Sequence, residues 1–258
     1  MTHLKAHVNI LKTSFFPQDI VAGFTEINNG VDEKLTNGLN FNLSEPFEFN
    51  VSKKILAEHL RRKVEYLKIP HQVHGKNVVV VDRNTNTEII DADGLITQDV
   101  EVVLGSTSAD CAVMLMFDPV QKVIASVHSG RKGTEQNIAE ATITKMTESF
   151  HCRPEHLLVS LQPSANVENY EVDDKTASSW PAEFVETFPS VDQNGQKKNF
   201  NSYHLNIKAR IAWQLKKAGV KAENIEISNI CTITNVRFHS YRREGKAHFK
   251  TNLGFIGL

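Results

Sequence analysis

The sequence lacks an excess of charge of one sign, an apolar run long enough to span a membrane, and enough cysteines for a disulfide framework. Lys+Arg is 29 and Asp+Glu is 30, so the net charge of -1 gives no strong field for nucleic acid or an anionic membrane. Uninterrupted apolar runs of about 18 residues, which a bilayer-spanning helix needs, are missing. The segment from Met1 to Val21 has no signal-peptide pattern, and three scattered cysteines are typical of a reducing compartment. We therefore expect a cytoplasmic protein without nucleic-acid or membrane partners.

Nucleotide-binding loops and internal repeats are missing as well. Neither G-x-G-x-x-G nor G-x-x-x-x-G-K occurs, which disfavours a dinucleotide or P-loop site. Hydrophobic residues make up 40% of the chain, enough for a sizeable core. The most polar segment, Gln193–Ser202, is expected to form a surface loop.

Hydrophobic periodicity predicts both helices and strands. Apolar residues at three- to four-residue spacing predict three helices, which are residues 52–69 with Ser52 as N-cap, 134–150 with Thr134 as N-cap, and 205–218 followed by Gly219. Short β-branched runs predict strands at 77–81, 100–104, 112–117, 123–127, 157–161 and 225–230. Because strands and helices do not alternate strictly, we expect an α+β protein with mixed sheets.

Polar clusters occur where the predicted strands end, between Pro70 and Gly133. Side chains at the ends of separate strands can converge at one rim of a sheet. The clusters are His71-Gln72-Val73-His74-Gly75, Asp91-Ala92-Asp93-Gly94, Ser108-Ala109-Asp110-Cys111 and Ser126-Val127-His128-Ser129-Gly130.

His74, Cys111 and His128 are a candidate set of metal ligands. Two imidazoles and one thiolate suit a catalytic zinc, which keeps an open position for water or substrate. The three residues are far apart in the sequence, so such a site forms only in the folded protein. Two other interpretations fit equally well: Cys111 as a nucleophile with a histidine base, or an inert buried thiol beside neutral histidines. Spacing does not decide among the three.

Aspartates and an arginine near these clusters are further candidates. Asp110 directly precedes Cys111 and is either an acid/base, a partner of a ligating histidine, or a turn residue. Asp91 and Asp93 fit a turn, which structure alone explains. Arg242, one of two adjacent arginines, can bind a phosphate or carboxylate through two hydrogen bonds.

Taken in order, these segments resemble the YfiH/YlmD family, also called the multicopper polyphenol oxidase or laccase-domain family. The resemblance runs over nearly the whole chain. The matching segments are Gly23-Phe24-Thr25, Asn29-Gly30-Val31, Gly38-Leu39-Asn40, Gln72-Val73-His74-Gly75, Asp93-Gly94-Leu95-Ile96-Thr97, Ser108-Ala109-Asp110-Cys111, Val127-His128-Ser129-Gly130, Tyr170-Glu171-Val172, Cys231-Thr232 and Ser240-Tyr241-Arg242.

The resemblance implies a fold and a chemistry. The fold is a single compact α/β/β/α layered domain over residues 1–258, with mixed sheets flanked by helices. The chemistry is purine nucleoside phosphorylase activity, with possible adenosine deaminase activity, in a monomer or homodimer that takes a nucleoside and phosphate. The residues implied are His74, Cys111 and His128 as ligands of zinc or copper, Asp110 and Cys111 as catalytic residues, and Asn40, Lys132 and Arg242 as substrate-binding residues.

The chain departs from the family pattern at positions that concern the substrate. Ile27 stands where the pattern has Arg, which removes an anion partner, and the Gly-Gly that follows reads Asn29-Gly30. Arg131 stands where the pattern has Trp, which removes an aromatic surface for a base. Two rival hypotheses remain. One is a copper-dependent phenol oxidase, disfavoured because the 11 histidines include no His-x-His pair; the other is a degenerate member that keeps zinc for stability and binds a partner.

Overall fold

Alternating side chains along the central strand explain why two sheets pack against each other. In β7 (Ala112–Asp118), Val113 and Leu115 point into one buried apolar cluster, and Met114 and Met116 point into another. Such a strand is covered on both faces and is therefore apolar at nearly every position. The first cluster lies between the two sheets, and the second lies between one sheet and its helices.

The structure is a computed structural model that describes residues 8–27, 38–87, 90–191, 197–247 and 249–258. One sheet has six strands in the order β13-β9-β7-β8-β5-β4, and the other has five in the order β1-β2-β14-β6-β3. Three pairs are parallel (β13–β9, β4–β5, β3–β6) and the others are antiparallel. The remaining bounds are β13 (Ile225–Ile227), β9 (Leu158–Leu161), β8 (Val123–Ser129), β5 (Gly94–Thr97), β4 (Val78–Val80), β1 (Ile10–Lys12), β2 (Val21–Thr25), β14 (Asn252–Gly257), β6 (Val103–Ser108) and β3 (Leu67–Lys68).

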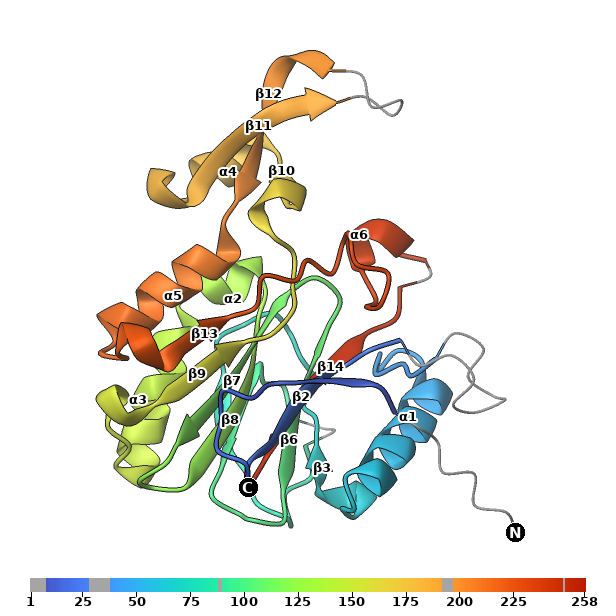
Figure 1. Cartoon of the computed structure of the whole chain (residues 1–258), viewed down its shortest axis with the longest axis vertical. Helices are drawn as coiled ribbons and strands as arrows, with labels where there is room; N and C mark the ends of the chain where they lie inside the picture. Colours follow the sequence, from blue (N-terminus) through green and yellow to red (C-terminus); the bar gives the residue numbers. More distant parts are fainter. Residues whose placement is uncertain (1–7, 28–37, 88–89, 192–196, 248) are drawn as a thin grey trace.

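Helices cover the outer face of each sheet (Figure 1). Helices α3 (Ile138–Phe150) and α5 (Ile207–Lys217) pack on the six-stranded sheet, and α1 (Pro46–His59) packs on the five-stranded sheet. The short helices are α2 (Arg131–Glu135), α4 (Asp174–Ser178) and α6 (Tyr241–Glu244), and the 3-10 turns are η1 (Val64–Tyr66), η2 (Pro154–His156), η3 (Val167–Asn169), η4 (Ala182–Phe184) and η5 (Ala222–Asn224). The predicted fold class, mixed sheets flanked by helices, is confirmed.

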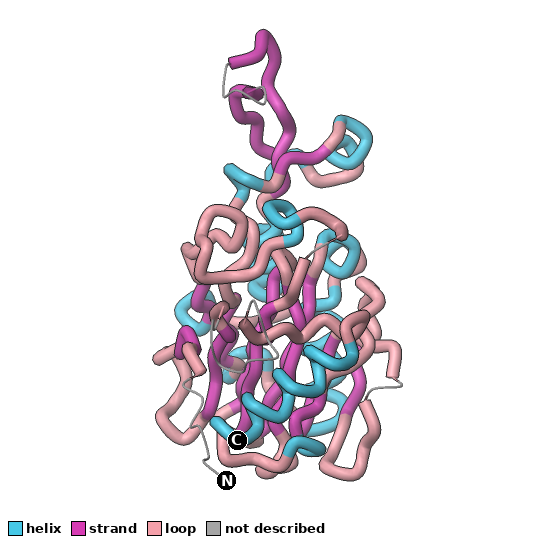
Figure 2. Tube along the Cα trace, turned by 90° about the vertical axis from the view of Figure 1, so that its right-hand side faces the viewer, coloured by secondary structure: helices cyan, strands magenta, loops and turns pink. Residues whose placement is uncertain are grey.

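A small third sheet forms an arm that projects from one end of the two-sheet body (Figures 1 and 2). It has the strand order β10-β12-β11, with all pairs antiparallel. The arm leaves the body after Tyr170 and returns to it just before Ile207. Its strands are β10 (Glu171–Val172), β11 (Val185–Val191) and β12 (Lys197–Leu205).

The first two predicted helices begin at other residues than expected. Pro46 opens α1, and the predicted cap Ser52 lies inside that helix, where its hydroxyl accepts a hydrogen bond from the Asn40 backbone N–H at 2.8 Å. Arg61 has φ of 55°, a left-handed conformation beyond the end of the helix, so the apolar residues from Val64 onward belong to η1 and β3.

The second predicted helix is divided in two by a left-handed residue. Thr134 lies within α2, and Asn137, with φ of 60°, caps α3 by accepting a hydrogen bond from the Glu140 N–H. The third predicted helix is confirmed as α5, and Gly219 has φ of +99° just after it.

The expected surface loop at Gln193–Ser202 is partly wrong. Residues 197–202 belong to strand β12, whose pairing with β11 overrides their polar composition, while residues 193–196 lie outside the described residues. Asn29 and Gly30 also lie outside the described residues. The strand prediction missed several strands, among them β2, β5 and β14, where glycines interrupt the β-branched pattern. In the described part of the chain, each helix is too short or too polar to cross a bilayer.

Candidate functional site

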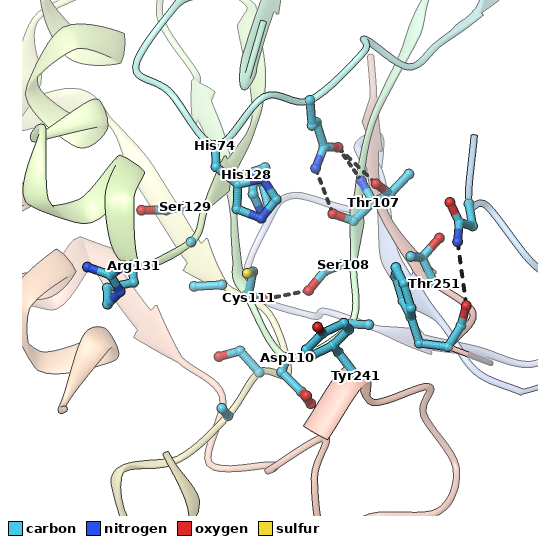
Figure 3. A pocket seen from close by; sticks show the side chains of 18 of the residues that line it. His74, Thr107, Ser108, Asp110, Cys111, His128, Ser129, Arg131, Tyr241 and Thr251 are labelled. Atoms are coloured by element: carbon cyan, nitrogen blue, oxygen red, sulfur yellow. Dashed lines mark hydrogen bonds between the residues drawn. The ribbon is translucent and has the colours of Figure 1, made fainter. Parts of the chain in front are cut away.

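The structure brings His74, Cys111 and His128 to one point (Figure 3). His74 lies in the turn between β3 and β4, Cys111 immediately precedes β7, and His128 is the sixth residue of β8. One potential ligand atom from each residue lies within 4.8 Å of the others. The two imidazole rings meet edge to face, with centroids 4.7 Å apart. The three residues therefore come from chain segments that only the fold places together.

Asp93 holds both histidines with one buried carboxylate. Its Oδ1 atom accepts hydrogen bonds from the His74 backbone N–H at 2.9 Å and from His128 Nδ1 at 2.8 Å. Its Oδ2 atom accepts from the Gly75 N–H at 2.7 Å and more weakly from the Val73 N–H at 3.3 Å. Our interpretation of Asp93 as a simple turn residue is incomplete, because this side chain is fully buried and fixes the orientation of two candidate ligands.

The same contacts shift the protonation equilibria of Asp93 and His128. Burial raises the Asp93 pKa, but the hydrogen bond and charge of His128, together with the Gly75 and Val73 N–H groups, lower it below 3.8 overall. Burial lowers the His128 pKa, but hydrogen bonds to Asp93 and Cys111 raise it to about 9. The resulting pair is a carboxylate beside an imidazolium when no other cation is bound.

Cys111 carries the thiol that completes the cluster. Burial raises its pKa, but hydrogen bonds and positive charge from His128, and then from His74, lower it from 9.0 to about 6. Since the thiolate is the form that ligates metals and attacks electrophiles, this environment prepares Cys111 for either role.

Gly130 leaves the space between the three side chains open. A methyl group at its Cα would lie 3.0 Å from Cys111 Sγ, 3.1 Å from His74 Cδ2 and 3.5 Å from His128 Cε1. The φ of Gly130 is -73°, so the constraint is space and not backbone conformation. Two imidazoles, one thiolate and the open space beside them fit a three-ligand metal site, in which His128 Nε2 faces Cys111 because Nδ1 contacts Asp93.

The cluster opens into a cavity of about 590 Å³. Strand ends and loops from both halves of the chain form its walls. The described residues that line it include Asn42, Leu43, Gln72, Thr107, Ala109, Asp110, Arg131, Tyr170, Ile207, Tyr241, Arg242 and Phe249. A volume of this order is typical of a site for a small organic ligand. The candidate metal ligands His74, Cys111 and His128 therefore lie beside space for a substrate.

Two arginines line this cavity. The Arg242 guanidinium lies over the Tyr170 ring, 4.8 Å from its centroid. Arg131 donates to Glu135 Oε1 at 2.7 Å, and the same oxygen accepts the Trp180 indole N–H at 2.6 Å. Arg131 is therefore held within a network, and the cavity carries two fixed positive groups.

Two predicted substrate-binding residues lie outside the cavity wall. Lys132 is exposed and does not line the cavity, because the next residue of a helix points about 100° away from Arg131, which does. Asn40 is fully buried below the wall: its Oδ1 accepts from the N–H groups of Asn42 and Thr251, and its Nδ2 donates to Glu48. Arg242 lines the cavity as expected.

Asp110 lines the cavity, but its carboxylate already accepts hydrogen bonds. Oδ1 accepts from the Thr232 hydroxyl at 2.7 Å, and Oδ2 accepts from the Ser240 hydroxyl at 2.9 Å and the Arg242 N–H at 2.8 Å. The residue has φ of 84°, which turns the chain sharply just before Cys111. This geometry joins the segment before β7 to the segment that carries Arg242.

Sequence reasoning missed three residues of the site: Asp93, Gly130 and Arg131. Asp93 acts through a hydrogen bond to His128, which is 35 positions away, and Gly130 acts through the space that it leaves beside Cys111. Arg131 lines a cavity that exists only in the fold. Asp93 was the easiest to find, because it precedes a buried strand and lies in a matching segment.

Comparison with known proteins gives a consistent set of relatives. A family model described as multi-copper polyphenol oxidoreductase laccase matches residues 21–258. A protein of Clostridium acetobutylicum named purine nucleoside phosphorylase is 30% identical over 214 residues, covering 82% of this chain and 84% of its own. Purine nucleoside phosphorylase YlmD of Bacillus subtilis is 26% identical over 254 residues, covering 93% and 89%.

Solved structures agree with the fold. YlmD from Geobacillus stearothermophilus superposes with a TM-score of 0.80 at 26% identity, covering 95% of this chain and 93% of its own. The hypothetical protein YfiH of Bacillus licheniformis has a TM-score of 0.79 at 24% identity, covering 93% and 92%, which is a likeness of fold.

Replacing Asp93 tests how the histidines are held. Asp93→Asn loses the charged acceptor of His128 Nδ1, and we expect metal affinity to fall about 10- to 100-fold. The measurement is a titration of the metal-free protein with zinc, with thermal unfolding as a check on folding. Asp91→Asn is the matched control, since Asp91 is exposed and pairs with His71. Equal zinc affinity in Asp93→Asn and the parent protein would contradict this role.

The pH dependence of Cys111 alkylation tests the electrostatics of the cluster. Because the Cys111 pKa is lowered to about 6, its thiolate persists above that pH and is lost as the pH falls through 6. In metal-free protein we expect the rate of iodoacetamide reaction to level off above pH of about 7, and zinc to block it. Cys152 is the internal control, since burial and then Asp118 raise its pKa to about 12. A Cys111 midpoint near 9.0 would show that the histidines do not act on the thiol.

Proposed function

The chain belongs to the multi-copper polyphenol oxidoreductase laccase family, and on that premise we propose that it is a metal-dependent enzyme that cleaves purine nucleosides with inorganic phosphate. The observation that carries this proposal is a His-Cys-His cluster at the wall of a cavity that also presents two arginines. Relatives named purine nucleoside phosphorylase support the reaction class.

We propose that His74, Cys111 and His128 hold a zinc ion. Bound there, zinc would supply Lewis-acid polarisation of a substrate oxygen beside its three ligands. The protein's own contribution is to fix the geometry: Asp93 orients His128, and Gly130 keeps the space beside the ligands clear. Copper is the alternative occupant, and metal analysis of protein reconstituted with each ion distinguishes the two.

Arg242 and Arg131 are proposed to hold the phosphate. Guanidinium groups bind phosphate through paired, charge-assisted hydrogen bonds, and both of these line the cavity. Arg131 therefore has the substrate-binding role that the sequence suggested for Lys132. In the reaction, a phosphate oxygen forms a bond to C1′ of the ribose, the C1′–N bond to the base breaks, and dihydrogen phosphate supplies the proton that the base takes.

Asp110 is proposed as a positioning residue. A proton-transfer role needs a free carboxylate oxygen near the substrate, whereas both Asp110 oxygens accept hydrogen bonds from the protein. Its contact with the Arg242 N–H instead fixes the segment that carries one phosphate ligand. Deamination with Asp110 as the proton-transfer group would require one of these hydrogen bonds to break, so the contacts of Asp110 favour phosphorolysis.

The phenol oxidase alternative has less support in the site. Within the described residues, the single group of three or more close His, Cys, Asp or Glu ligands is the His74, Cys111 and His128 cluster. Multicopper oxidation needs further ligands for additional copper ions, so the described site suits one metal ion. A dioxygen-uptake assay on copper-loaded protein tests this alternative directly.

Assays with and without phosphate test the proposed activity. We expect adenosine and inosine to give free base and ribose 1-phosphate only when phosphate is present, whereas inosine and ammonia formed from adenosine without phosphate would indicate deamination. Arg242→Gln and Arg131→Gln should each raise the KM for phosphate about 10- to 100-fold, because each removes a charged hydrogen-bond donor. Products are followed by chromatography.

The control for charge removal is Arg153→Gln, an exposed arginine paired with Glu155. It should leave the KM for phosphate unchanged, and His74→Ala should abolish turnover. Turnover in the zinc-loaded parent protein no greater than in His74→Ala would overturn the proposal.

Replacing Asp110 with asparagine distinguishes a positioning role of this residue from a role in proton transfer. In Asp110→Asn we expect the KM for phosphate to rise about 10-fold, with kcat falling less, because the Arg242 segment loses a charged acceptor. A proton-transfer residue would behave in the opposite way, with a large loss of kcat and a changed pH profile. Steady-state kinetics at several pH values decide between these outcomes.

A further inference from the structure

The cavity has an aromatic wall in addition to its two arginines. Tyr241 and Phe249 both line it, and their rings meet edge to face with centroids 5.0 Å apart. Tyr241 is 41% exposed, so part of its side chain is not covered by other protein groups. In Figure 3, Tyr241 and Arg131 lie on opposite sides of Cys111. The cavity thus offers ring surface on one side of the cluster and the charge of Arg131 on the other.

The Tyr241 side of this wall is fixed by two carboxylates. Asp110 accepts from the Ser240 hydroxyl and the Arg242 N–H, so it holds the residues on both sides of Tyr241. Glu244 accepts from the N–H groups of Ser240 and Lys250, which joins the start of α6 to the segment after it. The ring is therefore presented by a braced loop.

The Phe249 side of the wall is fixed by buried amides. Asn40 accepts hydrogen bonds from the N–H groups of Asn42 and Thr251, at 3.0 and 3.1 Å. The Asn42 amide in turn donates to the Phe249 carbonyl at 3.5 Å. Asn40, which the sequence suggested as a substrate contact, is placed to position the segment on which Phe249 stands.

The other rings and walls of the cavity are less suited to a flat apolar group. The face of Tyr170 is covered by the Arg242 guanidinium. Arg131 occupies the wall beside Gly130, and its charge favours an anion. Tyr241 and Phe249 present ring surface instead, and the same cavity is also lined by apolar Leu43 and Ala109.

We propose that Tyr241 and Phe249 form the surface on which the purine base stacks. The inference rests on the proposed function and adds an orientation: the base lies against the rings, the phosphate lies at Arg131 and Arg242, and the ribose C1′ lies between them beside the cluster. Stacking on aromatic side chains accepts any base with a π-face, so this wall binds 6-amino and 6-oxo purines alike.

The experiment compares Tyr241→Ala, Phe249→Ala and Tyr241→Phe in the zinc-loaded full chain. We expect each alanine variant to weaken adenosine and inosine binding about 10-fold, as measured by equilibrium dialysis and by the nucleoside KM, with the phosphate KM and zinc content unchanged. Tyr241→Phe keeps the ring and should bind as the parent does. The matched control is Tyr203→Ala, which removes a ring that is 39% exposed on the arm and does not line the cavity.

A spectroscopic probe distinguishes stacking from a structural effect. Stacking quenches the fluorescence of 2-aminopurine riboside, so the parent and Tyr241→Phe should quench the bound nucleoside, and Tyr241→Ala should quench it less at saturation. Adenosine binding and quenching in Tyr241→Ala and Phe249→Ala equal to the parent would overturn the inference and leave the proposed function standing.

The two proposals fail in different ways. Ring-dependent nucleoside binding without any phosphorolysis in the parent protein would overturn the proposed function and support the stacking surface. Failure of the zinc-loaded parent protein to bind adenosine or inosine at millimolar concentration would overturn both.

Discussion

One buried carboxylate organises the site. Asp93 accepts hydrogen bonds from the His74 backbone and the His128 ring with the same oxygen, while its other oxygen binds the turn that follows His74. Without these bonds, the left-handed His74, with φ of 60°, would lose the acceptor of its backbone N–H, and the His128 ring would lose the partner of its Nδ1 atom. A buried charge of this kind is stable only because every lone pair is used.

The sheet architecture explains why so distant residues meet beside a cavity. Strands β7 and β8 pair antiparallel, with Ala112 opposite Ser129. Cys111, just before β7, therefore lies next to the end of β8, where His128 and Gly130 lie. Asp93 comes directly before β5, the other neighbour of β8, and its backbone oxygen accepts from the His128 N–H at 2.7 Å. Three adjacent strands therefore place Cys111, His128 and Asp93 together, and Asp93 holds the turn that carries His74. The connections after β9 and before β14 contribute to the cavity walls.

Charge is separated within this cavity in a way that suits a substrate with two unlike ends. Arg131 belongs to a network with Glu135 and Trp180, and Arg242 is stacked on Tyr170. Tyr241 and Phe249 present ring surface instead. Asp110 and Asn40 are buried and hydrogen-bond to the segments that carry Arg242 and Phe249. These contacts explain their burial without contact to a substrate.

The sequence was sufficient to predict the fold class, the α5 helix and the central strands, because their apolar periodicity is local. It was insufficient at Ser52 and Thr134, since a hydroxyl that caps a helix looks the same in sequence as one inside a helix. The Ser52 hydroxyl accepts from the Asn40 N–H, and the Thr134 hydroxyl donates to the Gly130 carbonyl. The meeting of His74, Cys111 and His128 followed from resemblance and not from spacing. Asp93 and Gly130 act through a long-range hydrogen bond and through empty space, neither of which has a local sequence pattern.

The most direct measurement is anomalous diffraction at the zinc absorption edge from crystals of the zinc-loaded protein. We expect one strong peak with His74 and His128 nitrogens and the Cys111 sulfur at about 2.0–2.3 Å from it. A peak bound elsewhere, or a fully loaded crystal in which Cys111 lies away from the ion, would contradict it.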